Sequence, residues 1–391
     1  MVSKELKDAF LRLVRLGLGH SADALLDRVD WVELQTLTWR QGLSAVVLDG
    51  LDVLVSEGRL PRDLDLEPMQ KKMWIGQVLQ NYEYRYELYR RAIAEMAAFY
   101  NAHGFRMMVL KGYACSLDWP NPEHRPTGDI DIWQFGRYRE ADAALASEKG
   151  ISVDSSHHHH TVFYWRDFMV ENHYDFINVH HHRSNAEYEK ILKKLGEDDS
   201  QSVELCGVKV YLPSPNLHAL FLLKHMMLHF ASGEISVRQL LDWGFFVEKH
   251  GEAVDWPYVM VVLEKFGMRE LFEVFNAICV EDLGFDGSRF NFVDSCHDSA
   301  KQASLMALAA PRVQVLGFTS EVDRGLKERV LDEILSPEFG GETPSALIPR
   351  IAFKYRRWRA NEWKHRLCYK ESMWSAFWSG VWNHLLKPSS I

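Results

Sequence analysis

Two aspartates that alternate with isoleucines form the segment with the clearest chemical potential. Asp129 and Asp131 stand in the sequence Asp-Ile-Asp-Ile, and alternate residues of a strand point the same way. The two carboxylates would therefore share a face, while Ile130 and Ile132 point into the core. Carboxylates held this close repel each other, and Mg²⁺ binds carboxylate oxygens together with substrate phosphates. The spacing predicts a metal site that orients a nucleoside triphosphate, although turns and surface strands also produce Asp-x-Asp.

A lysine and a glycine precede the aspartates and strengthen this interpretation. Lys111 and Gly112 follow an apolar segment, residues 106–110, that reads as a short strand. A glycine after a strand lets the backbone approach a phosphate closely, and the amides of the following turn or helix can point at the anion.

These residues resemble a known family. Leu-Lys-Gly, then an arginine, then a small residue before Asp-Ile-Asp-Ile, is similar to the uncharacterised nucleotidyltransferase group of the DNA-polymerase-beta-like nucleotidyltransferase superfamily. The resemblance covers roughly residues 25 to 250. Its other parts are Asp30-Trp31, Trp39-Arg40-Gln41-Gly42, the Pro213-Ser214-Pro215 start of a helix, and Val237-Arg238-Gln239-Leu240-Leu241-Asp242.

The resemblance implies a metal-dependent enzyme that transfers a nucleoside monophosphate from a nucleoside triphosphate (NTP) to an acceptor hydroxyl, with release of pyrophosphate. Asp129 and Asp131 would hold Mg²⁺ or Mn²⁺. Gly112 would admit the phosphates, and Lys111 or Arg125 would neutralise developing charge. The acceptor, a small molecule or a protein, is not specified by any spacing in the sequence.

Two positions depart from the family pattern. Tyr113 stands after the motif glycine, where a small residue is common. The family's third carboxylate, in an Asp-x-His pattern, best matches Asn178, which can ligate a cation weakly but cannot act as a general base. Asp175 is the alternative third ligand, although at odd spacing from Asn178 it would point to the opposite face. If a base is required, His180 is the nearest candidate.

Histidines are concentrated in two runs, residues 157–160 and 180–182. The arms of an expected hairpin are residues 157–165 and 174–182, with a polar turn near 167–172, which would set His158 opposite His180 and His160 opposite Asn178. Neutral imidazoles bind Zn²⁺, Ni²⁺ or Mn²⁺. One interpretation is a metal site beside the aspartates, and the other is a set of partly buried, hydrogen-bonded side chains.

The elements around these motifs predict an α+β fold, with a small mixed sheet of polymerase-beta-like type between helical regions. We expect a helical region at residues 1–100, a sheet domain at 101–214 and a second helical region at 215–391. Apolar residues at steps of three and four predict a helix over residues 69–100, and residues 137–148 and 208–212 read as a helix and a strand. His218, His225 and His229 would share one helix face, with a structural role favoured.

A later helical segment holds Arg238 and Asp242 at a spacing of four. A simple ion pair on one helix is favoured over contact with substrate. The tail has arginines and lysines around tryptophans, residues 354–370, followed by tryptophans at steps of four, Trp374, Trp378 and Trp382. A packing stripe, in the core or at an interface, is favoured there over an RNA-binding or anionic-surface-binding segment.

Composition limits the class of protein. The 391 residues carry a formal net charge of −9, so nucleic acid is not expected as a partner. Five cysteines without Cys-x-x-Cys spacing support neither a disulfide scaffold nor a zinc finger. No segment has the apolar length of a membrane span, and the first residues read as a helix rather than a signal peptide, so the cytoplasm is expected.

Two alternatives to transfer activity follow from the same residues. Asn178 in place of a carboxylate could leave a catalytically impaired protein that binds a nucleotide and a metal without turnover. The tryptophan-rich tail could instead belong to a helical interaction protein in which the sheet is a remnant.

Overall fold

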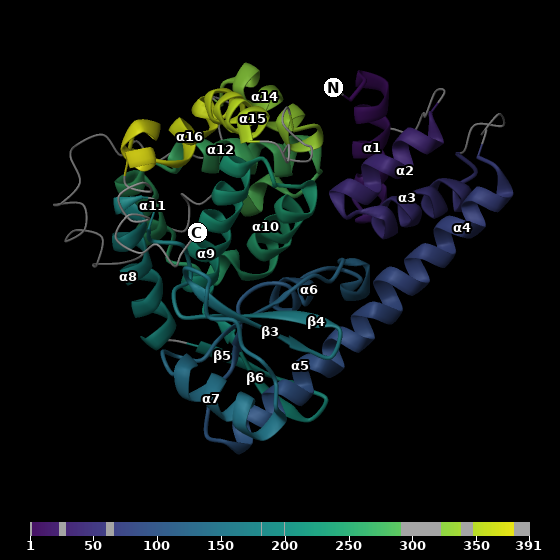
Figure 1. The fold of residues 1–391 in the computed structure, drawn as a ribbon. Coiled ribbons are helices and arrows are strands. Elements are labelled where there is room, and N and C mark those ends of the chain that lie inside the picture. Colours follow the sequence, from purple (N-terminus) through teal and green to yellow (C-terminus); the bar gives the residue numbers. More distant parts are fainter. Residues whose placement is uncertain are drawn as a thin grey trace. The chain divides into compact units, whose positions relative to one another are not determined.

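A computed structural model describes residues 2–22, 29–59, 66–180, 182–198, 200–290, 322–337 and 347–378 (Figure 1). Contacts divide the chain into two units. Unit 1 consists of Met1–Val78 and Met226–Tyr369, and unit 2 of Leu79–His225 and Lys370–Ile391. The divisions at residues 78/79 and 225/226 fall inside continuous helical segments, and the third follows α16. The sequence predicts boundaries near residues 100 and 214, where one type of element gives way to another.

Unit 1 is helical in its described residues. Its elements are α1 (Lys4–Gly17), α2 (Trp31–Gln41), α3 (Ser44–Ser56), α4 (Pro68–Val78), α10 (Val237–His250), η3 (Gly251–Ala253), α11 (Trp256–Phe266), α12 (Arg269–Ala277), η4 (Ile278–Asp282), η5 (Gly287–Phe290), α14 (Arg324–Leu335), α15 (Leu347–Ala360) and α16 (Glu362–Cys368).

One buried glutamine, Gln41 of α2, forms hydrogen bonds to α14 and α10 of unit 1. The Gln41 side chain donates to the Ile334 carbonyl at 3.0 Å and accepts from the Val237 amide at 2.8 Å. Gly42 ends α2 in the left-handed conformation, at φ 71°. The Trp39-Arg40-Gln41-Gly42 segment therefore contains a residue that links α2 to α10 and α14.

Unit 2 contains the sheet. Its elements are η1 (Leu79–Tyr84), α5 (Arg85–Ala102), β1 (Met108–Val109), α6 (Tyr113–Ser116), η2 (Pro122–His124), β2 (Ile130–Trp133), α7 (Tyr138–Lys149), β3 (His160–Trp165), β4 (Phe168–His173), α8 (Arg183–Asp198), β5 (Ser200–Leu205) and β6 (Val208–Pro213). Helix α9 (Pro215–Ser232) begins in unit 2 and ends in unit 1.

The six strands of the described residues form one mixed sheet in the order β3-β4-β2-β1-β6-β5. Strand β2 runs parallel to β4 and antiparallel to β1, and β1 runs parallel to β6. The two outer pairs, β3 with β4 and β5 with β6, are antiparallel. The predicted α+β class with a mixed sheet flanked by helices is therefore confirmed.

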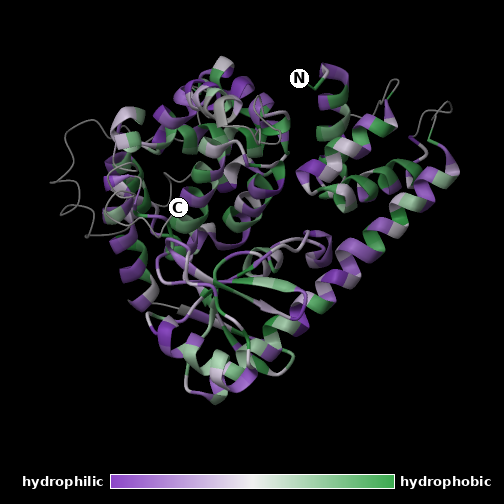
Figure 2. Ribbon diagram, in the orientation of Figure 1, coloured by the Kyte–Doolittle hydropathy of each residue, from purple (hydrophilic) through white to green (hydrophobic). Residues whose placement is uncertain are grey.

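One face of the sheet is covered by α5 and α7. Ile130 and Ile132 of β2 and Val170 of β4 are buried in a cluster with residues of these two helices. Because side chains alternate along a strand, Asp131 and Glu171 point to the other face. Hydrophobic and hydrophilic residues alternate along α5 in Figure 2, as expected for a helix with one face on a sheet. The core thus fixes which face of β2 presents its carboxylates.

The hairpin is present, but its second arm was placed wrongly. Strand β4 is Phe168–His173, and Trp165 pairs with Phe168 across Arg166 and Asp167. The sequence predicts a polar turn near residues 167–172 because this segment is rich in polar side chains such as Glu171 and Asn172. These residues form a strand because both faces offer polar partners, including Asp142 of α7, which accepts a hydrogen bond from Asn172 at 2.8 Å.

The predicted helix over residues 69–100 is confirmed with one irregularity. Helical structure runs without a break from Pro68 to Ala102, and Leu79–Tyr84 is a π-helical segment. The predicted apolar stripe is buried over most of its length, but Ile75 and Leu79 are exposed. A π-helical insertion changes the angular register of a helix, so a stripe at constant steps cannot stay on one face across it.

The C-terminal tryptophans behave differently from one another. Trp363 packs against Phe230, with ring centroids 5.5 Å apart, and against Arg329. Trp374 and Trp378 are exposed, so they are not part of the core. Packing at an interface stays a prediction for these two, and Trp382 lies outside the described residues. None of the described helices has the length and apolar character needed to span a bilayer.

Candidate metal and nucleotide site

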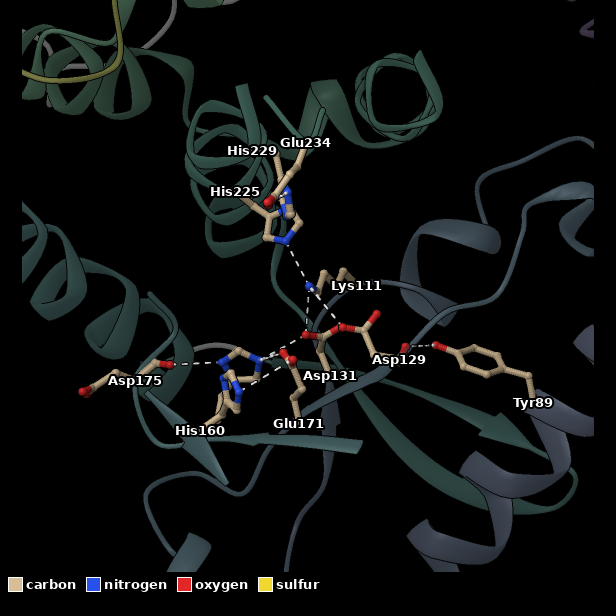
Figure 3. Close-up of polar contacts among 11 residues, drawn as sticks. Tyr89, Lys111, Asp129, Asp131, His160, Glu171, Asp175, His225, His229 and Glu234 are labelled. Atoms are coloured by element: carbon tan, nitrogen blue, oxygen red, sulfur yellow. Dashed lines mark hydrogen bonds and ion pairs between the residues drawn. The ribbon is translucent and has the colours of Figure 1, made fainter. Parts of the chain in front are cut away.

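Two carboxylates stand at the start of β2 on the sheet face opposite α5 and α7. Asp131 is 1% exposed, and its main chain binds β1 because the Leu110 amide donates to the Asp131 carbonyl at 3.0 Å. Asp129 precedes the strand, and about a third of its side chain, 34%, is exposed. Figure 3 shows both carboxylates directed toward Lys111. The alternation predicted from Asp-Ile-Asp-Ile is therefore realised.

Lys111 faces both aspartates. Its Nζ lies 2.9 Å from Asp131 Oδ1 and 4.0 Å from Asp129 Oδ2. The same ammonium group contacts His225 Nε2 of α9 at 2.9 Å. His225 was expected to be structural, and its partner is instead a residue of the candidate site.

Gly112 and Tyr113 begin the turn that follows Lys111. Gly112 has a φ of +62° and leads into the short helix α6. The Tyr113 side chain is buried in the core cluster of unit 2. The bulky residue that departs from the family pattern therefore points into the core.

Glu171 and His173, on strand β4, complete the group around Asp131. The Cα atoms of Asp131 and Glu171 are partners in the parallel ladder. His173 Nε2 lies 3.1 Å from Asp131 Oδ1 and 3.5 Å from Glu171 Oε2, and Nδ1 donates to the Asp175 carbonyl at 3.1 Å. One ligand atom from each of Asp131, Glu171 and His173 lies within 4.8 Å of the other two.

Sequence reasoning missed Glu171 and His173 because their strand was read as a turn. The family's pattern of a carboxylate followed two residues later by a histidine has a counterpart in Glu171-Asn172-His173. The sequence prediction placed that pattern at Asn178 and His180, where an amide stands in place of the carboxylate. The pattern would have identified the residues if the strand had been placed correctly.

The electrostatics of the site concentrate negative charge on Asp131. Burial alone would raise the pKa of Asp131, but Lys111 and His173 outweigh it and hold the pKa far below its usual range. Repulsion by Asp131 and then burial raise the pKa of Asp129. Asp131 is therefore the ionised carboxylate around which the group is organised.

Two cationic groups balance this charge. Burial would lower the pKa of Lys111, yet the two aspartates raise it above the ordinary lysine value. Burial would also lower the pKa of His173, but hydrogen bonds to Asp131 and Glu171 raise it to about 9. A divalent cation at Asp131 would compete with these positive groups for the same oxygens.

The residues present fit a hard divalent cation. Asp131 Oδ2 is buried and has no hydrogen-bond partner among the described residues. A buried carboxylate oxygen without a partner is costly unless something compensates its charge. Together with Glu171 it offers the oxygen ligands that Mg²⁺ or Mn²⁺ prefers.

The remaining predicted residues lie in several places. Asn178 follows β4 in a loop, where its Oδ1 accepts from the His180 amide at 2.8 Å and its carbonyl accepts from Asn185 at 2.7 Å. The expectation that Asn178 stands on a strand is therefore wrong. Arg125 is buried and donates to the Pro126 carbonyl at 3.2 Å.

The two histidine runs meet only in part as predicted. The rings of His158 and His180 lie 5.3 Å apart, so this expected proximity is confirmed. His160 pairs with His173 rather than with Asn178, because β4 ends before Asn178. His181 lies outside the described residues.

Arg238 and Asp242 lie on α10 of unit 1, and Asp242 is buried there. A substrate-facing role for these two residues stays a prediction.

The fold and these residues define a protein of the nucleotidyltransferase kind, with a mixed sheet that presents carboxylates from two adjacent strands beside a lysine. The chain belongs to the family described as uncharacterised nucleotidyltransferase, whose profile matches residues 27–283. The match extends beyond the segment at residues 25 to 250 that suggested the resemblance. Comparison with curated proteins and with solved structures finds no match.

Proposed function

We propose that the protein is a metal-dependent nucleotidyltransferase that transfers a nucleoside monophosphate from an NTP to an acceptor hydroxyl. Family membership supports the general kind of reaction. The observation that carries the metal dependence is Asp131, buried and ionised, with one oxygen lacking a partner among the described residues and Glu171 beside it on the next strand. The proposed metal ligands are Asp129, Asp131 and Glu171.

In this proposal Glu171 takes the role expected of Asn178. The carboxylate of Glu171 can hold a cation or accept a proton, whereas the amide of Asn178 cannot act as a base. The impaired-protein alternative depended on Asn178 at the third position. The position of Glu171 beside Asp131 supports turnover over that alternative.

The transfer step follows from these assignments. The acceptor oxygen attacks the α-phosphorus, its proton passes to a carboxylate such as Glu171, and the bond to the β-phosphate breaks as pyrophosphate leaves with the electron pair. Lys111, and Arg125 as the second candidate, would stabilise the negative charge that develops on the phosphates. A bound Mg²⁺ or Mn²⁺ would supply orientation of the triphosphate and withdrawal of charge from its oxygens.

Calorimetric titration with ATP, GTP, CTP and UTP, in the presence of Mg²⁺ or Mn²⁺, tests the proposal. We expect metal-dependent binding of at least one nucleotide, and a loss of roughly tenfold or more in affinity for Asp131→Asn, because this change removes an ionised metal ligand. The matched control is Glu95→Gln, an exposed carboxylate on α5 that pairs with Arg166. Absence of nucleotide binding by the unmodified protein would contradict the proposal.

Pyrophosphate release with candidate acceptors separates the two residues proposed for the third position. We expect Glu171→Gln to abolish release, and Asn178→Ala to retain most of it, because only Glu171 stands beside Asp131. The opposite result would return the role to Asn178. Nucleotide binding without release for every acceptor tried would favour the impaired-protein alternative.

A further inference from the structure

A group of three histidines lies next to the carboxylates and has no part in the transfer step. His160 is the first residue of β3 and His159 directly precedes it. His173 is the last residue of β4, across from His160 in the antiparallel ladder. One nitrogen from each ring lies within 4.8 Å of the other two. The ring centroids are 4.3 Å apart for His159 and His160, and 5.3 Å apart for His160 and His173.

Two of these histidines have an unused nitrogen inside the protein. Nδ1 of His159 and Nδ1 of His160 are buried and have no hydrogen-bond partner among the described residues. The whole His160 side chain is 8% exposed. A buried imidazole nitrogen normally has a partner, so two adjacent ones without any indicate that a ligand completes them.

The third ring is already held in place. His173 Nδ1 donates to the Asp175 carbonyl at 3.1 Å, which fixes the ring and directs Nε2 at Asp131 and Glu171. A metal would bind here by displacing the proton on Nε2, because only a deprotonated imidazole nitrogen coordinates a cation.

The spacing requires a small adjustment. Nitrogens that share one metal at tetrahedral angles lie about 3.4 Å apart, since a metal–imidazole bond is about 2.1 Å long. The separations in this group extend to no more than 4.8 Å. A shift of the side chains by some tenths of an ångström brings the three nitrogens to coordinating distance.

We propose that His159, His160 and His173 bind a divalent transition metal of the class that prefers imidazole, such as Co²⁺, Zn²⁺ or Mn²⁺, directly beside the carboxylates of Asp131 and Glu171. Mg²⁺ prefers oxygen ligands and is not expected at the histidines. Figure 3 shows His160 next to Glu171, and His160 Nε2 lies 3.7 Å from Glu171 Oε1. The carboxylates could therefore contribute a fourth ligand.

The metal would also change the surroundings of Asp131. His173 Nε2 faces Asp131 Oδ1 at 3.1 Å, and a nitrogen that coordinates a metal can no longer donate a hydrogen bond to that oxygen. Occupancy of the histidine site would then release Asp131 Oδ1 toward the nucleotide-bound cation. This coupling deepens the proposed function, although metal binding itself does not depend on nucleotide transfer.

Titration of the full-length protein with Co²⁺ alone, followed by visible absorption and calorimetry, tests the histidine site without any nucleotide. We expect one Co²⁺ per chain with the absorption bands of a nitrogen-containing low-coordinate site. The variants His159→Gln and His160→Gln should each weaken Co²⁺ binding by roughly tenfold or more, since each removes a ligand. His158→Gln is the matched control, because it changes the same run outside the group, and its affinity should stay within about twofold of the unmodified protein.

Three results would overturn the proposal. The first is the absence of such Co²⁺ absorption in the unmodified protein. The second is equal weakening by His158→Gln, which would indicate loose chelation by the whole run. The third is a site lost in Asp131→Asn but intact in His159→Gln and His160→Gln, which would place the metal on carboxylates alone. Thermal unfolding of each variant without metal verifies that it is folded.

One further variant separates this proposal from the proposed function. Asp129→Asn removes a carboxylate outside the histidine group, so it should weaken Mg²⁺-dependent nucleotide binding and keep Co²⁺ binding. Co²⁺ binding without any nucleotide binding would leave the histidine site standing and contradict the transferase. Nucleotide binding without the Co²⁺ site would do the reverse.

Discussion

Two separate features of the structure require glycine at position 112, its backbone conformation and its close contact with Tyr89. Its φ of +62° is rarely adopted by residues with a Cβ, and a Cβ at this position would stand 2.4 Å from Tyr89 Oη. The tyrosine cannot withdraw freely, because its hydroxyl donates to the Asp129 carbonyl at 3.1 Å. The requirement for glycine beside the candidate site is therefore set partly by α5.

We expect Gly112→Ala to lower the free energy of unfolding by about 1–3 kcal/mol, because backbone strain and steric overlap act together. In a Tyr89→Phe background the overlapping hydroxyl is absent, and the next ring atom would be 3.5 Å from the Cβ. Urea denaturation of the four proteins forms a double-mutant cycle, in which the alanine should cost less in the phenylalanine background. Equal costs in both backgrounds would show that Tyr89 does not restrict Gly112.

Glu189 of α8 gives the protein a stability that depends on pH. It is 3% exposed, and its two oxygens accept from the amides of Phe176 and Ile177 at 2.9 and 3.1 Å. Burial raises its pKa from 4.5 to about 7 even though the Phe176 hydrogen bond lowers it. Between these two pH values the folded state keeps a proton that the unfolded state has lost, so stability falls as pH rises.

The expected result is a difference between the unmodified protein and Glu189→Gln. Relative to this variant, the unmodified protein should lose up to about 3 kcal/mol of unfolding free energy as pH rises from 4.5 to 7, and the difference should level off above 7. Urea denaturation at a series of pH values measures it. Glu187→Gln, an exposed change on the same helix, leaves Glu189 in place and should keep the pH dependence of the unmodified protein. The same pH dependence in Glu189→Gln as in the unmodified protein would refute the assignment.

At the scale of elements, α1 and α3 cross at a pair of glycines. A Cβ at Gly17 would stand 1.9 Å from the Val46 carbonyl oxygen, and one at Gly50 would stand 2.1 Å from the Leu13 carbonyl oxygen. Each helix backbone therefore touches the other directly, and a methyl group would have to push the two helices apart.

We expect Gly17→Ala and Gly50→Ala each to lower the unfolding free energy by about 1–3 kcal/mol, because the overlap is with backbone that cannot rotate away. Gly76→Ala is the matched control, since Gly76 is in α4 and a Cβ there meets nothing within 4 Å. That change should raise stability by about 0.5–1 kcal/mol through helix propensity. Denaturation midpoints of the three variants measure the difference, and a gain for all three would contradict close helix packing.

The elements that could be predicted from sequence were those with strong periodicity. The helix of residues 68–102 and strand β2 follow from apolar spacing, and the start of α9 follows from Ser214 and Pro215. Strand β4 could not be placed because Glu171 and Asn172 face polar groups on opposite sides of the sheet, so no apolar alternation marks them. For the same reason the candidate site was found at Asp129, Asp131 and Lys111 but not at Glu171 and His173.

At the scale of the whole molecule, fold class and family follow from local motifs, whereas the division into units does not. The change from helical to strand patterns near residue 100, and back near residue 214, predicts three consecutive regions, and that division stays a prediction. Contacts group Met1–Val78 with Met226–Tyr369. The grouping of these two segments depends on long-range contacts, for example the hydrogen bond from Gln41 to the Ile334 carbonyl. Local residue spacing does not predict such contacts.

The two segments of unit 1 flank residues 79–225, and this arrangement affects the order in which the chain can fold during synthesis. A chain emerges from the ribosome from its N-terminus, and residues 79–225, which carry all six strands, are contiguous. The sheet can therefore assemble while synthesis continues. The helices of residues 1–78 cannot pack in unit 1 until residues 226–369 have been made. Closing so long a loop slows folding, because its entropy is lost before distant contacts form. Residues 1–78 thus keep the surface that packs with residues 226–369 uncovered until those residues are made, and exposed apolar surface of this kind favours contact with chaperones.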